Sequence, residues 1–214
     1  MNRIRFDHVV PEVFSDLPVE ASQVWHHDIS IEKGQSYLLL ADSGKGKSTL
    51  CSYLLGYRND YSGRLLFDDD DVAGYDIPRW TEVRQKHISL LFQELRLFPE
   101  LTAYENIEIK NTLTHHLSEA SIRQWFERLG IADKWNAKVG KMSFGQQQRV
   151  AMIRALSQPF DFLLVDEPIS HLDDSNAQLM GTLIQEEVDK QGAGLIVTSI
   201  GKHFQMDYNH TLQL

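Results

Sequence analysis

With 214 residues, the chain is long enough for one globular domain, or for one domain with a small subdomain, around a sizeable hydrophobic core. Its formal net charge of −9 argues against a broad nucleic-acid surface, because such a surface needs clustered Lys and Arg to neutralise phosphates. A lone cysteine, Cys51, excludes an internal disulfide, and the sequence, with no apolar run of about 18 residues and no secretory leader, predicts a soluble, cytoplasmic protein without direct membrane insertion.

Residues 1 to about 92 have the pattern of short strands and turns. The segments "DISI", "SYLLL", "GRLLF" and "HISLLF" predict strands, and residues 49–55 predict a helix. From about residue 102 the pattern becomes helical. Thr102 and Glu105 form a capping box ahead of one predicted helix, and Ser118 can cap a second helix that Gly130 ends.

The last third of the chain alternates between helix and strand. The segments "GQQQRVAMIRALSQ" and 175–190 predict helices, and "FDFLLVDE" and "GLIVTS" predict strands. Buried strands that alternate with helices indicate a parallel sheet. The sequence therefore predicts an α/β fold with a mostly parallel core sheet.

The segment "ADSGKGKST", which begins at Ala41, almost matches a phosphate-binding loop. Gly44 and Gly46 allow close approach of the backbone to phosphate, Lys47 supplies a charge, and Ser48 supplies a hydroxyl for Mg²⁺ at a helix N-terminus. The strict pattern has glycine at the first position, where the alanine methyl group costs roughly 1–2 kcal/mol only if φ is positive. We therefore expect Mg-ATP to bind. The expected contacts are Ser43, Gly44, Lys45, Gly46, Lys47, Ser48 and Thr49.

Two carboxylates follow the predicted strand at residues 162–165. Asp166 can hold Mg²⁺ through water, and Glu167 is placed to polarise an attacking water as a general base. By itself the pattern could also be an acidic turn after a buried strand. The phosphate-binding loop upstream favours the second half of a nucleotide site.

Five motifs, in order, resemble those of the nucleotide-binding subunits of ABC transporters. "ADSGKGKST" resembles Walker A, "LLFQE" the Q-loop, "MSFGQ" the signature, "FLLVDE" Walker B, and "SHLD" the D-loop. Together they extend over nearly the whole chain. Phe144 departs from the signature, because it stands where the family has its second glycine. The resemblance implies a P-loop NTPase fold of the ABC ATPase type, with an antiparallel β part and a helical subdomain beside the parallel sheet.

The resemblance also implies an organisation and a set of roles. It implies a single domain over residues 1–214, with about 1–92 and 158–214 as the nucleotide-binding core and about 93–157 as the helical subdomain. Two copies would enclose two Mg-ATP, each site combining one copy's Walker motifs with the other copy's signature. The implied catalytic residues are Glu167, Lys47 and Gln93; the implied metal-binding residues are Ser48, Gln93 and Asp166; and the further ATP contacts are Phe14, Ser143, Gly145, Gln146 and Asp173.

An aromatic residue is expected to stack on adenine in this family. Phe14 and Trp25 both precede the phosphate-binding loop, and either could instead be a core aromatic. We favour Phe14. The apolar residues Leu95, Leu97 and Phe98 follow Gln93, where the family receives a helix of its membrane subunit. Core packing is the alternative interpretation for these three.

The stretch at 84–107 resembles the bacterial LolD, FtsE and MacB group. This implies a transmembrane permease subunit as partner, at the inner face of the cell membrane, and a second ATPase subunit in a homodimer. ABC ATPases of DNA maintenance would need long heptads, and ribosome-acting factors carry two ATPase domains, so both classes fit poorly.

One departure keeps a regulatory protein with very slow hydrolysis as an alternative. The resemblance places a histidine that contacts the γ-phosphate after the last predicted strand, and this chain has Ser199 there. We expect ATP to bind well and turnover to be reduced. Rescue by His203 is the weaker interpretation, because the chain would have to turn back toward the phosphate.

Overall fold

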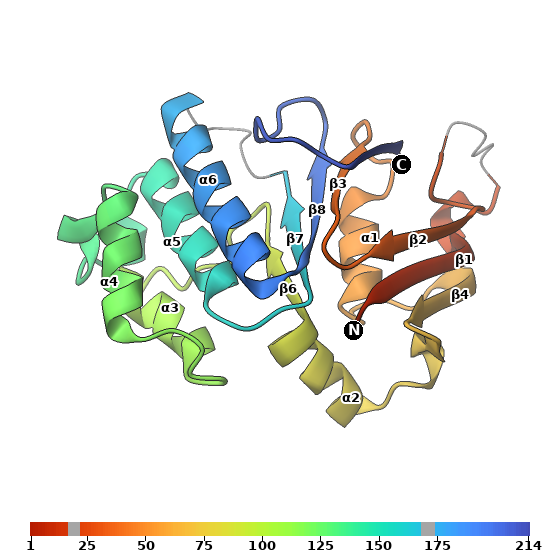
Figure 1. Ribbon diagram of the computed structural model, residues 1–214, viewed down its shortest axis with the longest axis horizontal. Helices are drawn as coiled ribbons and strands as arrows, with labels where there is room; N and C mark the ends of the chain where they lie inside the picture. The colour runs from red at the N-terminus through yellow and green to blue at the C-terminus, as the bar shows by residue number, and fades with distance from the viewer. Residues whose placement is uncertain (17–21, 168–173) are drawn as a thin grey trace.

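The computed structural model describes residues 1–16, 22–167 and 174–214. Within these residues, five strands form a parallel sheet in the order β6-β7-β8-β3-β9 (Figure 1). Continuous apolar runs are typical of parallel strands covered on both faces, and two inner strands, at Phe162–Asp166 and Gly194–Ser199, are buried at every position. The strands are β3 (Ser36–Leu40), β6 (Ile88–Leu91), β7 (Phe162–Asp166), β8 (Gly194–Ser199) and β9 (His210–Gln213).

A second, antiparallel sheet has the order β2-β1-β4-β5 within the described chain. Its strands are β1 (Arg3–Pro11), β2 (Asp28–Glu32), β4 (Tyr61–Phe67) and β5 (Asp70–Asp71). The sequence pattern did not indicate β1, β5 or β9. In β1 the register against β4 shifts between Asp7 and Val10, and His8 adopts a positive φ of 54°. This bulge interrupts the alternation of buried and exposed positions by which a strand is found in a sequence.

The helices within residues 103–191 lie on one side of the parallel sheet, and the helix that follows β3 lies on the other side (Figure 1). The predicted capping box of Thr102 and Glu105 is present, and Ser118 accepts a hydrogen bond from the Ser121 amide at the next helix start. The helices are α1 (Lys47–Leu54), α2 (Ile77–Glu82), α3 (Ala103–Asn111), α4 (Glu119–Arg128), α5 (Phe144–Leu156) and α6 (Asp174–Gln191). Short helical turns lie at Glu12–Phe14, Val72–Gly74, Val83–His87, Ala132–Lys134 and Val139–Lys141.

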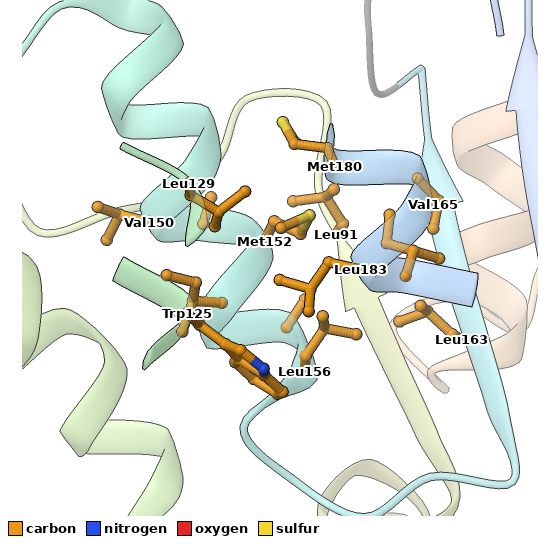
Figure 2. Close-up of a cluster of buried hydrophobic side chains, with 14 of the residues drawn as sticks. Leu91, Trp125, Leu129, Val150, Met152, Leu156, Leu163, Val165, Met180 and Leu183 are labelled. Atoms are coloured by element: carbon orange, nitrogen blue, oxygen red, sulfur yellow. The ribbon is translucent and has the colours of Figure 1, made fainter. Parts of the chain in front are cut away.

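Two hydrophobic clusters flank the parallel sheet. One joins the sheet to α4, α5 and α6, and Figure 2 shows Trp125, Met152 and Leu183 meeting between these elements. The other joins the sheet to α1 and the antiparallel sheet. Cys51 lies in this second cluster, where burial raises the pKa of its thiol, in keeping with a packing role.

This architecture confirms the predicted α/β fold, with a parallel core sheet, an antiparallel part and a group of helices. Across the described ranges, no helix is both long enough and apolar enough to cross a lipid bilayer. The carboxyl ends of β3, β7 and β8 lie at one edge of the sheet, since Leu40 pairs with Ser199 and Asp166 pairs with Thr198. Ligands of open α/β sheets bind at such an edge.

Candidate functional site

The loop between β3 and α1 curls back through two glycines. Gly44 has a φ of 81° and Gly46 a φ of 98°, values that strain other residues. Ala41 is not among the residues with positive φ, and its amide donates to the carbonyl of Ser199 at 3.0 Å. Its methyl group therefore carries no left-handed penalty. The departure from the strict pattern leaves the shape of the loop unstrained at this point.

The Lys47 side chain folds back onto the loop between β3 and α1. Its Nζ donates to the carbonyl oxygens of Ala41 and Asp42, both at 2.9 Å, and lies 3.3 Å from Oε1 of Glu167. The Lys47 side chain is 5% exposed, so its charge is compensated by these oxygens and by the carboxylate. A positive charge is thus fixed at the mouth of the loop, where the outer phosphates of a nucleotide would lie.

Asp166 accepts a hydrogen bond on each of its carboxylate oxygens. The hydroxyl of Thr198 donates to Oδ1, and the hydroxyl of Ser48 donates to Oδ2 at 3.1 Å. Asp166 is 6% exposed, and these two bonds satisfy an otherwise costly buried charge. Hydroxyl and carboxylate oxygens are the donors that Mg²⁺ prefers, so the residues present fit the expected metal.

The Glu167 carboxylate contacts Gln93 on one side and Lys47 on the other. Its Oε2 accepts a hydrogen bond from Nε2 of Gln93 at 3.1 Å, while its Oε1 pairs with Lys47. Its φ of 46° places a non-glycine residue in the left-handed region, which costs roughly 1–2 kcal/mol. Glu167 lines the cavity beyond the strand end.

Lys47, Gln93 and Glu167 line one cavity of about 480 Å³. Phe14 lines it and also lines a neighbouring cavity of about 620 Å³. Trp25 is 1% exposed and its Nε1 donates to the carbonyl of Lys45 at 3.3 Å, so it is a core residue that supports the loop. Phe14 is half-buried and lines both cavities, whereas Trp25 lines only the larger one. The walls of the first cavity include Phe14, Ser43, Gly44, Gly46, Lys47, Ser48, Thr49, Gln93 and Glu167.

The signature residues lie elsewhere. Ser143 caps α5, its Oγ accepting from the Gln146 amide at 3.4 Å and its own amide donating to Gln146 Oε1 at 3.1 Å. Neither these two residues nor Gly145 lines the cavity that holds Lys47. One copy therefore does not bring the signature to its own loop. Asp173, the predicted D-loop contact, lies outside the described residues.

The turn after Gln93 differs from the expectation for its apolar residues. Leu95 is 6% exposed and packs in the core, so the idea that it faces a membrane subunit is wrong. Phe98 is 52% exposed. Leu95 and Arg96 both have positive φ, and Arg154 of α5 donates to both of their carbonyl oxygens. This link between α5 and the turn had no local signal in the sequence.

Ser199 and His203 occupy the chain after β8. Ser199 is fully buried; its hydroxyl donates to the Lys202 carbonyl at 2.7 Å and accepts from the Gly201 amide at 2.9 Å. Nδ1 of His203 lies 3.0 Å from the Gly201 carbonyl oxygen, and His203 lines the 620 Å³ cavity rather than the one with Glu167. Neither residue lines the cavity that contains Glu167.

Comparison with known proteins agrees with this geometry. The chain is 31% identical over 172 residues to the ABC transporter ATP-binding protein YtrE of Bacillus subtilis, covering 79% of this chain and 74% of YtrE. It is 32% identical over 164 residues to the macrolide export ATP-binding/permease protein MacB of Vibrio parahaemolyticus, covering 75% of this chain and 25% of MacB.

A similar fold occurs in the dimeric, post-hydrolysis state of the ATP-binding cassette MJ0796 bound to ADP and Pi. The TM-score is 0.75 at 26% identity, covering 92% of this chain and 87% of that one. The family model described as ABC transporter matches residues 25–170. The chain therefore belongs to the ABC transporter family, as one of its ATP-binding proteins.

Proposed function

We propose that this chain binds Mg-ATP and hydrolyses it as the ATP-binding subunit of a bacterial ABC transporter. The observation that carries the proposal is the convergence of Lys47, Glu167 and Gln93 on one cavity, beside the Ser48–Asp166 pair. A cation for phosphate, a candidate general base and oxygen ligands for a metal are the groups that phosphoryl transfer to water requires.

Each group has a defined task in this proposal. Lys47 and the backbone amides of the loop bind the outer phosphates, and Phe14 stacks on the base. Glu167 accepts a proton from the attacking water, and Gln93 orients Glu167. Ser48, Asp166 and Gln93 would hold Mg²⁺, which supplies charge neutralisation at the phosphates when bound.

Dimerisation completes the site. Ser143, Gly145 and Gln146 are remote from the loop of their own copy, and a helix N-terminus offers amides to an anion. We infer that they contact ATP held by a second subunit. Because MJ0796 is dimeric, a homodimer of this chain has a structural precedent.

A membrane permease is the proposed partner. MacB is named as an ATP-binding/permease protein, and this chain covers 25% of it. We propose that the chain works with a transmembrane permease subunit at the cytoplasmic face of the membrane, and that closure on ATP drives work of the kind done in the LolD, FtsE and MacB group. We retain the proposed division into a core (about 1–92 and 158–214) and a helical subdomain (about 93–157).

A regulatory ABC protein with very slow hydrolysis is the second candidate. The observation that favours it is Ser199, whose hydroxyl is engaged within its own turn and does not contact Glu167. Phosphate release by the purified chain, measured with and without a co-purified membrane subunit, separates the two candidates. Turnover that rises with the membrane subunit supports a transporter, and turnover that stays negligible in both supports a regulator.

Exposed Phe98 is the expected contact with the membrane subunit. A cysteine at Phe98 carrying a thiol-linked photo-crosslinker should label that subunit in the assembled complex, because exposed aromatic residues are typical of interface anchors. The native Cys51 is buried and should not compete. Tyr57 is equally exposed, at 52%, and a cysteine there is the matched control. Equal labelling from both positions would remove Phe98 from the interface.

A further inference from the structure

The turn after β8 places Lys202 at the wall of a cavity that the candidate general base also lines. The Ser199 hydroxyl holds this turn through the Gly201 amide and the Lys202 carbonyl. Such serine-to-backbone bonds fix short turns. A cavity of about 210 Å³ is lined by Glu167, Ile200, Gly201 and Lys202. The residue that departs from the family pattern is therefore the one that positions Lys202.

This small cavity adjoins the larger one. Glu167 and Ile200 line both of them, so Lys202 shares a cavity with the residue whose carboxylate pairs with Lys47. Lys202 is exposed, and within the ranges 1–16, 22–167 and 174–214 its Nζ makes no ion pair. A lysine carries its charge on a flexible four-carbon stem, which allows Nζ to reach across a gap that a serine hydroxyl cannot span.

We propose that Lys202 contacts the terminal phosphate group of bound ATP, a contact that the family pattern assigns to a histidine where this chain has Ser199. The inference rests on the proposed ATP-binding function. Lys202 is a better candidate than His203, because Nδ1 of His203 faces the Gly201 carbonyl and its ring lies against Tyr208, with centroids 5.8 Å apart. An ammonium group supplies charge to the phosphate, but it does not hold Glu167 and water in register as a ring could.

The contact should discriminate between nucleotides, since ADP lacks the terminal phosphate. Equilibrium titration with Mg-ATP and with Mg-ADP should show that Lys202→Ala and Lys202→Gln bind ATP about tenfold or more weakly than the native chain and bind ADP equally well. Lys202→Arg keeps the charge and should retain most of the preference for ATP. Lys86 is also exposed and lies in the turn Val83–His87, so Lys86→Ala is the matched control and should bind both nucleotides like the native chain.

The variants should keep the fold, because the turn uses the backbone carbonyl of Lys202 and not its side chain. Thermal unfolding of each variant verifies this. A Lys202→Ala protein with the native ratio of ATP to ADP affinity overturns the proposed contact while leaving the proposed function standing. A native chain that binds neither nucleotide overturns both the contact and the function on which it rests.

Discussion

Glu167→Gln is expected to lower ATP turnover by about 10²–10⁴-fold while ATP still binds. The amide keeps the size of the side chain, but it cannot accept a proton from water. The ion pair with Lys47 is lost, whereas a hydrogen-bonding partner for Gln93 remains. Because bound ATP is then not consumed, the variant should accumulate as a closed dimer. Phosphate release, nucleotide affinity and size-exclusion chromatography with ATP measure the three effects.

Glu127→Gln is the matched control for this variant, because Glu127 is exposed on α4 and lies outside every described part of the site. It should have native turnover and a native response to ATP in chromatography. If Glu167→Gln also hydrolyses ATP at the native rate, Glu167 is not the base. The metal and the loop would then be the chief catalytic elements.

Ser199→His should raise turnover, by up to about 10²–10³-fold where the new ring reaches the transferring phosphate. A positioned electrostatic contact to the transferring phosphate commonly raises the rate by this factor. The native Ser199 hydroxyl is not available for such a contact, because it is hydrogen-bonded to the backbone of Gly201 and Lys202. His203→Ala should leave turnover unchanged, because the His203 ring lines the other cavity. The three proteins are compared in one phosphate-release assay, with the membrane subunit present where it co-purifies.

Ser199 is fully buried, so the larger ring can disturb the turn. Ser199→Ala, which removes the two hydrogen bonds without adding a ring, is the control for this disturbance, and thermal unfolding monitors the fold of both. Brisk native turnover that collapses in His203→Ala would contradict the account and make His203 the displaced switch residue. If turnover rises in Ser199→His and is unchanged in His203→Ala, the serine at position 199 is the reason for the low turnover of the native chain.

The sequence allowed the central sheet to be predicted because its strands are apolar runs with clear boundaries. The strands β7 and β8 are of this kind, and their ends carry Asp166 and Thr198. Strand β1 escaped prediction because the bulge at His8 breaks its alternation, and β9 because its burial is partial. The periodicity of apolar residues therefore predicts regular strands in a covered sheet better than it predicts irregular strands or edge strands.

Part of the site was also predictable, because its residues lie close together in the sequence. These are the residues of the phosphate-binding loop and the two carboxylates at the end of β7. Other features depend on contacts between distant segments. Arg154 donates to the carbonyls of Leu95 and Arg96 across 59 and 58 positions of sequence, respectively. The positive φ of these two residues has no signature in composition. Whether Ala41 is strained depended on its φ, which a sequence pattern does not contain.

Titration of the native chain with ATP in the presence of Mg²⁺ tests the central claim most directly. We expect saturable binding by the native chain and by Ala41→Gly alike, since Ala41 is unstrained. We expect no binding by Lys47→Ala, because the charge held by the loop carbonyls and Glu167 is then absent. A native chain that does not bind ATP under Mg²⁺, or a Lys47→Ala variant that binds it as tightly as the native chain, would contradict the account.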